Sequence, residues 1–156
     1  MIQRMGVPDL LTDRGGFTLI EIVIIIVTLG ILAAVAVPRF ADMANGAKVN
    51  ATKQEMLSLK KAIVGDPSAV SGGQHIDRGF EGDLGNPPSQ LQDLAVKPDT
   101  LAGYDPLTRL GWNGPYIDGA NNDYLSDAWG NSYVYRPGSR TILSTGGGSD
   151  TLEINF

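Results

Sequence analysis

The first feature of the chain is a continuous apolar run near its N-terminus. Residues 17–37 read FTLIEIVIIIVTLGILAAVAV, and Glu21 is their only charged side chain. A helix rises 1.5 Å per residue, so the run spans roughly 30 Å, the thickness of a bilayer core. Its many Ile and Val residues favour a strand in water, but lipid requires every backbone N–H and C=O to bond within the segment. The pattern therefore predicts a transmembrane helix over residues 17–38.

Beyond Pro38 the pattern becomes that of an amphipathic helix. An interior proline removes one helical hydrogen bond, and with Gly30 it marks a place where the helix is expected to kink. Two apolar stripes then recur at a spacing of three or four residues. They are Phe40, Met43, Ala44, Ala47 and Ala51, and Val49, Met56, Leu59 and Ile63. Gly65-Asp66-Pro67 ends the pattern, so residues 39–64 form an amphipathic stem whose second stripe needs a cover.

The rest of the chain predicts a small cap for this stem. Residues 65–108 are rich in turn-forming residues, and only residues 89–96, SQLQDLAV, resemble a short helix, with Ser89 as its N-cap. Residues 109–156 contain three short strands at 132–136, 140–144 and 151–155, separated by Gly-rich turns. We expect an α+β fold in which the long helix packs against a small antiparallel sheet.

Five aromatic side chains in residues 109–156 supply large apolar surfaces: Trp112, Tyr116, Trp129, Tyr133 and Tyr135. We expect them to form the small core that covers the stem. A surface that binds a sugar or an aromatic ligand is the alternative.

Composition narrows the functional classes. The chain has 12 Lys and Arg against 17 Asp and Glu, a net charge of −5, which argues against a nucleic-acid partner. It has no cysteine, which excludes a disulfide scaffold, a thiolate zinc site and a cysteine nucleophile. The one histidine, His75, stands among loop residues. A membrane-anchored enzyme would have to use carboxylates, and these are scattered without motif spacing, so we expect no enzymatic activity.

Residues 1–16, MIQRMGVPDLLTDRGG, form a short polar segment before the apolar run. Arg14 near the membrane end favours a cytoplasmic N-terminus by the positive-inside rule. Glu21 is the anomaly, because an ionisable side chain inside such a run is costly and marks a functional position. Either it reaches the interface, or it pairs with a cation. The natural cation is the free α-amino group that a cut just before the run would create.

The segment GGFTLIE, residues 15–21, followed by the apolar run that ends at Val37-Pro38, resembles the N-terminus of type IV pilins and type II secretion pseudopilins. The resemblance implies that a prepilin peptidase cuts between Gly16 and Phe17, removes the leader 1–16 and N-methylates Phe17; Met5 is an alternative start of that leader. It also implies that Glu21 pairs with the Phe17 amine of a neighbouring subunit. The helix between Gly30 and Pro38 then either unwinds in the filament or kinks on leaving the membrane.

The C-terminal segments RLGWNGPYI and LSDAWGNSYVYRPG resemble the major pseudopilins of type II secretion. The resemblance implies the type IV pilin-like fold and a subunit of a helical filament. The subunit would sit in the inner membrane with its C-terminal domain in the periplasm, and would then join a periplasmic filament. Its partners would be further copies of itself, minor pseudopilins, an inner-membrane assembly platform and lipid. The alternative is an extracellular type IV pilus subunit for adhesion, motility or DNA uptake.

Calcium is the one cofactor that the resemblance raises. Major pseudopilins usually carry a longer Gly/Asp-rich loop that holds calcium, whereas the loop here is short and offers Asp150. Asp118 and Asp123 lie in a second acidic turn, DGANND. Calcium takes six to eight oxygen ligands. We expect no bound metal, and name Asp118, Asp123 and Asp150 as the candidate ligands if calcium binds.

Overall fold

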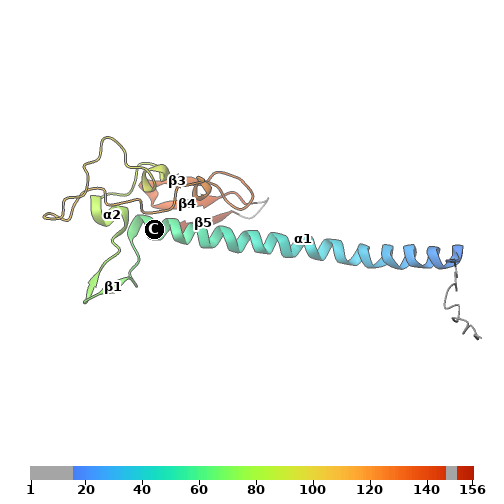
Figure 1. Ribbon diagram of the computed structural model, residues 1–156. Coiled ribbons are helices and arrows are strands. Elements are labelled where there is room, and N and C mark those ends of the chain that lie inside the picture. Colours follow the sequence, from blue (N-terminus) through green and yellow to red (C-terminus); the bar gives the residue numbers. More distant parts are fainter. Residues whose placement is uncertain (1–15, 147–150) are drawn as a thin grey trace, which may run out of the picture. The chain divides into compact units, whose positions relative to one another are not determined.

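The computed structural model describes residues 16–146 and 151–156, so the proposed leader up to residue 15 and the candidate ligand Asp150 lie outside the described residues. The chain comprises two compact units, residues 1–41 and residues 42–156. Helix α1, Leu19–Val64, is the dominant element and has 46 residues (Figure 1). It continues through Gly30 and Pro38 as one helix.

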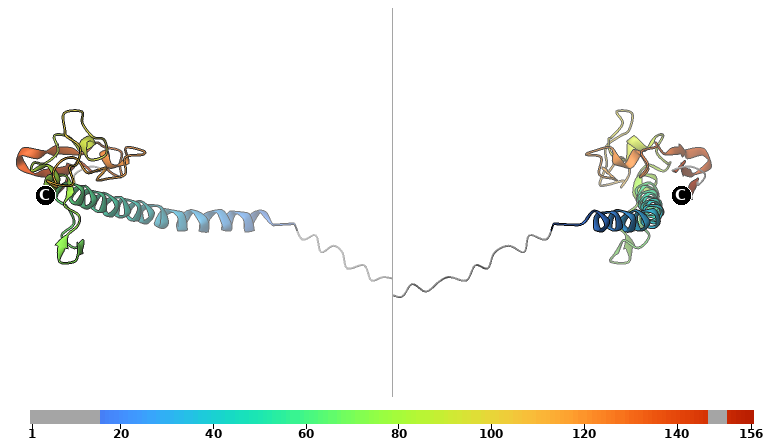
Figure 2. Two further views of the ribbon diagram at one scale, coloured as in Figure 1. Left: turned by 60° about the vertical axis from the view of Figure 1, so that its left-hand side comes forward. Right: turned by 90° about the vertical axis from the view of Figure 1, so that its right-hand side faces the viewer.

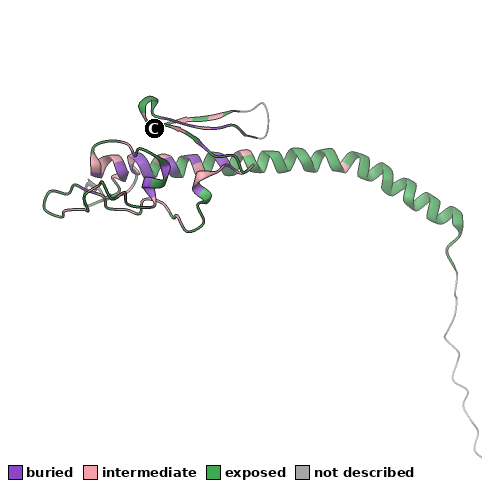
Figure 3. Cartoon of the chain, turned by 90° about the horizontal axis from the view of Figure 1, so that it is seen from above, coloured by how far each residue is buried: buried purple, intermediate pink, exposed green. Residues whose placement is uncertain are grey.

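The C-terminal part of α1 buries one stripe of side chains. Thr52, Met56, Leu59, Ala62 and Ile63 are its buried residues, and Figure 3 shows them gathered near the end of the helix. They include three members of the second predicted stripe. All members of the first predicted stripe are exposed. The expectation that the second stripe needs a cover is therefore confirmed.

Short elements follow α1 where the sequence predicts mostly loop. Strands β1, Val70–Ser71, and β2, Gln74–His75, form a hairpin. It projects on the side of α1 away from the three-stranded sheet (Figure 2). Helix α2, Gly79–Leu84, comes next and was not predicted. Gly79 has φ +62°, and a Cβ there would lie 2.2 Å from the Gly65 nitrogen, so only glycine permits α2 to begin against the end of α1.

The predicted helix over residues 89–96 is wrong in its length and in its cap. The structure has a single 3₁₀ turn, η1, Leu91–Leu94, preceded by Gln90. The Asp93 carboxylate accepts hydrogen bonds from the backbone N–H groups of Ser89 and Gln90, each at 3.2 Å. The Asp93 carboxylate, inside the turn, thus satisfies the free N–H groups at its start. The prediction had given this capping role to the Ser89 hydroxyl.

The three predicted strands are confirmed and form one antiparallel sheet in the order β3-β4-β5. They are β3, Val134–Arg136, β4, Thr141–Ser144, and β5, Leu152–Asn155. A 3₁₀ turn, η3, Pro137–Ser139, joins the first two. The sheet lies alongside the C-terminal part of α1 (Figures 1 and 2). Fully buried Ile142 on the central strand contributes the sheet's main share of the core.

The core joins the stem to the cap. It consists of Met56, Leu59, Ala62 and Ile63 of α1 and of Phe80, Leu91, Leu94, Tyr124, Tyr133 and Ile142 from the cap. Polar contacts tie the same elements: Lys60 Nζ donates to the Asn155 carbonyl at 2.8 Å, and the Tyr133 hydroxyl donates to Glu55 at 3.0 Å. Four of the five aromatic residues named from the sequence belong to or pack against this core. The exception is Trp129, whose Nε1 donates to Asn45 of α1 at 3.2 Å.

A buried carboxylate organises the DAWGN turn that precedes β3. Asp127 is 5% exposed and accepts hydrogen bonds from the backbone N–H groups of Trp129 and Asn131 on one oxygen. Its other oxygen accepts from the Ser144 hydroxyl of β4 at 2.6 Å. The Thr52 hydroxyl of α1 accepts the Ala128 N–H at 3.1 Å. The turn is therefore fixed to both the stem and the sheet.

Candidate functional site

The part of α1 before residue 42 presents apolar side chains that no other described residue covers. From Phe17 to Val37 every large hydrophobic side chain is at least 39% exposed, and Phe17 itself is 73% exposed (Figure 3). Among the described residues, α1 is the one helix long and apolar enough to cross a membrane. Apolar surface of this extent does not stay in water, so it is covered either by lipid or by other protein chains.

The start of α1 places the predicted processing and assembly residues side by side. Gly16, Phe17 and Thr18 precede the helix outside any regular element, and Glu21 lies in its first turn. The Glu21 backbone N–H donates to the Thr18 hydroxyl at 3.3 Å and to the Thr18 carbonyl at 3.1 Å. Thr18 is therefore the N-cap, a role the sequence analysis missed although Thr-x-x-Glu is a recognisable cap signal.

This geometry leaves the Glu21 carboxylate free for another chain. The side chain is exposed, and no cation pairs with it among the described residues. A carboxylate in the first turn also suits the positive end of the helix dipole. Cutting before Phe17 would place an ammonium group on the residue that precedes the N-cap. The pairing of Glu21 with Phe17 of a neighbour stays a prediction, as do the unwinding and kinking expected between Gly30 and Pro38.

Of the three candidate calcium ligands, Asp118 and Asp123 are described, and Asp150 lies outside the described residues. Asp118 uses one oxygen to accept the Ala120 N–H at 3.0 Å within its own turn. Asp118 and Asp123 line the same open groove beside α1, with Glu55 on the helix side. In the part of the chain that the structure describes, no group of three or more His, Asp or Glu side chains lies close enough to hold a metal ion. The side chain of His75 lies outside the description.

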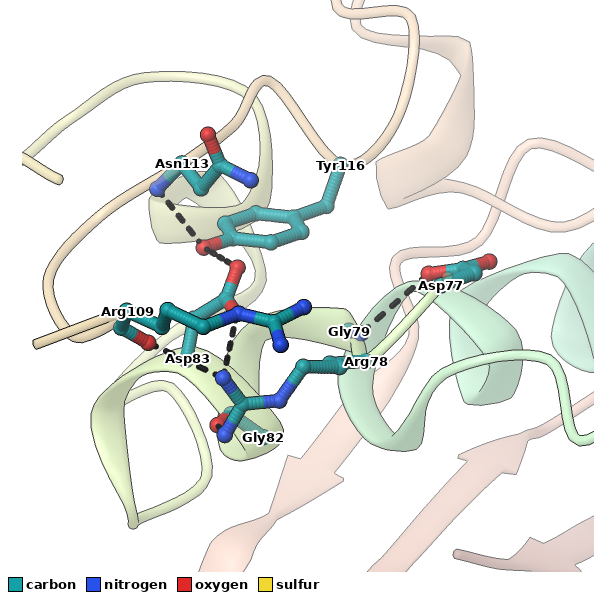
Figure 4. Close-up of polar contacts among 8 residues, drawn as sticks. All are labelled: Asp77, Arg78, Gly79, Gly82, Asp83, Arg109, Asn113 and Tyr116. Carbon is teal, nitrogen blue, oxygen red and sulfur yellow. Dashed lines mark hydrogen bonds and ion pairs between the residues drawn. The ribbon is translucent and has the colours of Figure 1, made fainter. Parts of the chain in front are cut away.

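A second polar cluster centres on Arg78, just before α2 (Figure 4). Its guanidinium donates to the carbonyl of Arg109 at 2.9 Å and to the carbonyl of Gly82, and lies 3.8 Å from an Asp83 oxygen. No pattern in the sequence pointed to this cluster, because its members come from two segments about thirty residues apart. Arg78 thereby ties α2 to the loop that carries Arg109.

Tyr116 completes the cluster from the opposite side (Figure 4). Its hydroxyl donates to Asp83 at 3.0 Å and accepts the Asn113 N–H at 2.9 Å. Burial, reinforced by the Asp83 charge, raises the pKa of Tyr116 to about 12, so the hydroxyl keeps its proton at neutral pH. The side chains of Arg78, Asp83 and Tyr116 each have a partner within the cluster. The arrangement therefore holds the loop that carries Arg109 and Tyr116 against α2.

Comparisons with known proteins agree with the geometry of α1 and the small sheet. The chain is 32% identical over 134 residues, 82% of its length, to type II secretion system core protein G of Pseudomonas aeruginosa, of which 78% is covered. It is 30% identical over 123 residues to the protein of the same name from Xanthomonas campestris pv. campestris, covering 79% of this chain and 68% of that relative.

A third relative comes from pili. The chain is 62% identical over 40 residues to the type IV narrow pilus major component PilA5 of Thermus thermophilus, a match that covers 24% of this chain and 34% of that protein. No family model matches the chain, and no solved structure matches it.

Proposed function

Because the chain belongs to the family of type II secretion system core protein G, the major pseudopilins, we propose that its exposed apolar helix is the segment by which copies assemble. The chain is a structural subunit of a type II secretion filament. The observation that supports this use of the helix is the uncovered apolar surface from Phe17 to Val37. Before assembly, lipid covers this surface as a single-pass membrane anchor. In the filament, the same segments of other subunits cover it.

The proposed maturation follows from the start of α1. A prepilin peptidase cuts between Gly16 and Phe17 on the cytoplasmic side and methylates the new amine. Because α1 crosses the membrane from there, the C-terminal domain lies in the periplasm. The ammonium of Phe17 then pairs with Glu21 of a neighbour. Leaving either charge unpaired in a low-dielectric core is expensive, so this pair sets the axial offset between subunits. A contact between two different surfaces of identical chains continues as an open helix.

In this proposal the protein works by assembly rather than by catalysis. The sequence contains no Gly-x4-Gly-Lys-Ser/Thr phosphate loop, so ATP hydrolysis belongs to a separate motor. An inner-membrane platform adds subunits, minor pseudopilins join the same filament, and the growing rod pushes exported proteins through an outer-membrane channel. The subunit works without a resident metal ion.

Two substitutions and one control test the maturation and the charge pair. Gly16→Ala is expected to block cleavage and leave the precursor in the membrane. Glu21→Ala is expected to be cut normally and to lower filament yield at least tenfold. Glu153→Ala, which removes an exposed carboxylate on β5, should assemble like the wild type. Intact mass spectrometry and filament counts are the readouts. Normal filaments from Gly16→Ala would disprove the cleavage, and wild-type yield from Glu21→Ala would disprove the pairing.

A surface pilus is the second candidate, because of the 62% identity over 40 residues to a pilus component. That match covers a quarter of the chain, whereas the core protein G matches cover about four-fifths of it. The two functions differ in where the mature subunit accumulates. The secretion filament predicts N-methyl-Phe17 chains retained in the washed envelope. The pilus predicts the same chains in abundance in material sheared from the cell surface.

A further inference from the structure

Residues 105–110 form a short loop, here called the 105–110 loop, that is held rigid by its own hydrogen bonds. The Asp105 N–H donates to the Leu110 carbonyl at 2.8 Å, and the Arg109 N–H donates to the Asp105 carbonyl at 2.7 Å. The Asp105 carboxylate also accepts the Leu107 N–H at 2.9 Å and the Thr108 hydroxyl at 3.0 Å. The loop is therefore ordered without burying any large apolar side chain of its own.

The tip of this loop presents one apolar and one cationic side chain to solvent. Leu107 is 94% exposed, the highest value for any large hydrophobic side chain in the described residues. Arg109 has φ +56°, an uncommon conformation for a non-glycine residue, and Arg78 holds its carbonyl from below (Figure 4). No carboxylate among the described residues pairs with the Arg109 guanidinium. A preorganised tip with unused apolar and charged groups is typical of a contact surface.

The acidic groove beside α1 has the complementary character. We define the acidic groove by its apolar lining, which includes Ala51, Ile117 and Ala120, and by its three carboxylates, Glu55, Asp118 and Asp123. The ion pairs among the described residues involve none of these carboxylates. Burial, and then the charges of Asp123 and Asp127, raise the pKa of Glu55. The three carboxylates give the groove a negative charge, and no ion pair with a Lys or Arg among the described residues offsets it.

We propose that the 105–110 loop of one subunit docks into the acidic groove of a second copy of this chain. Leu107 would lie on the apolar lining, and Arg109 would reach the carboxylates of Asp118 and Asp123. The near-complete exposure of Leu107 means that it does not occupy the groove of its own subunit. Because the loop and the groove are different surfaces, their contact is head-to-tail, the kind that builds an open filament. The inference rests on the proposed filament and adds a contact between the caps to the contacts between the helices.

Disulfide cross-linking tests the contact directly, because the chain has no cysteine of its own. Two differently tagged full-length chains are co-expressed, one carrying Leu107→Cys and the other Ala120→Cys, and filaments in the envelope are oxidised. A disulfide forms only when the two Cα atoms lie within about 7 Å. We expect a heterodimer that carries both tags. The matched control pairs Leu107→Cys with Ser139→Cys, an exposed position on η3 outside the groove, and should give none.

A charge exchange tests the pairing independently. Arg109→Glu and Asp123→Arg are each expected to lower filament yield at least fivefold, and the double variant is expected to recover at least half of it. Arg136→Glu, an exposed arginine on β3, controls for the change in net charge and should assemble normally. Recovery in the double variant requires that the two positions meet. If the single variants fail and the double variant recovers nothing, the pairing is wrong.

The outcomes separate this inference from the proposed function. Wild-type filaments whose cysteine pair links no better than the control would overturn the docking and leave the filament function intact. Failure of the wild-type chain to form any filament would overturn the filament function, and the docking with it. If Asp123→Arg does not fold, the cross-linking result alone decides, because Leu107 and Ala120 are both exposed, where substitutions change stability little.

Discussion

Replacing Asp127 with asparagine would probe the buried carboxylate on which the DAWGN turn depends. The substitution keeps the side chain's size and one acceptor oxygen, so the N–H groups of Trp129 and Asn131 keep their partner. It turns the other oxygen into an NH₂ group, which faces the Ser144 hydroxyl. That hydroxyl already accepts the Gly146 N–H, at 3.1 Å, and would lose the acceptor for its own proton.

The expected cost follows from the bonds that change. A hydrogen bond to a charged acceptor contributes about 1.5–3 kcal/mol, and the Ser144 bond at 2.6 Å is the shortest that Asp127 accepts. The hydrogen bonds from the backbone N–H groups of Trp129 and Asn131 remain, but their acceptor is now neutral and each bond is weaker. We therefore expect Asp127→Asn to lower the free energy of unfolding by about 2–3 kcal/mol. For a unit of this size that corresponds to a fall in Tm of roughly 10 °C.

The assay is thermal unfolding of the full chain in detergent micelles, followed by the fluorescence of its two tryptophans. Repeating the measurement at several pH values tests whether the ionised Asp127 carboxylate provides the stability. The hydrogen bonds from Ser144, Asn131 and Trp129 outweigh burial and lower the pKa of Asp127. A carboxylate with a lowered pKa stabilises the folded state above its unfolded pKa of about 3.9, and this stabilisation is lost as the pH falls through the folded value. The gap between wild type and variant should therefore be full at pH 6 and shrink below about pH 4.

The control is Asp118→Asn, which makes the same chemical change on an exposed turn whose one hydrogen bond an asparagine can keep. It should change the free energy of unfolding by less than about 0.5 kcal/mol. A loss below about 0.5 kcal/mol for Asp127→Asn, or an equal loss for the two variants, would refute the reasoning that burial makes the Asp127 network strong.

Three further predictions concern the stem, the α2 ion pair and calcium. Leu59→Ala, at a fully buried position, should lower the free energy of unfolding in urea by about 2–5 kcal/mol. Leu57→Ala, at a half-exposed position on another face of the helix, should lower it by under about 1 kcal/mol. Equal losses would contradict the burial of the stripe. Glu81→Gln removes a two-bond pair with Arg140, at 2.7 and 2.8 Å, and should cost up to about 1 kcal/mol at pH 7 in low salt. Because the Arg140 hydrogen bonds lower the pKa of Glu81, that cost should vanish as the pH falls below about 4.5, and a cost independent of pH would refute it. The Tm values measured with calcium and with EDTA should agree within about 1 °C, because only an ion that binds the folded state raises Tm. A clear rise with calcium would contradict the proposal that the subunit works without a metal ion.

Local patterns predicted the long helix and the three-stranded sheet, but not the β1–β2 hairpin or α2. The 21 residues of the apolar run contain one charge, and no soluble strand pattern fits such a length, so a membrane-length helix was predictable. The stem was predictable because its apolar residues recur with the helical period until Gly65 ends it. The strands of the sheet were predictable to within two residues, because Gly-rich turns bound each of them.

The start of α1 shows both the reach and the limit of such patterns. GGFTLIE predicts the processing site and the role of Glu21 through its resemblance to pilin N-termini, and both stay predictions. The same letters contain the Thr18 cap, which the local pattern Thr-x-x-Glu is enough to predict. The neighbour that would pair with Glu21 belongs to another chain, so neither the sequence nor one subunit supplies that contact.

Only the tertiary structure decided which groups meet across the cap. Two apolar stripes of the stem looked alike in sequence, and the packing of Tyr133 and Ile142 decided that the stripe with Met56, Leu59 and Ile63 is the buried one. Asp127 reaches Ser144, 17 residues away, and Arg78 reaches Arg109, 31 residues away. Periodicity reports on residues a few positions apart, because helices and strands bond within short stretches. Contacts between distant segments depend on how whole elements pack, which is why the loop and the acidic groove emerged only from the folded chain.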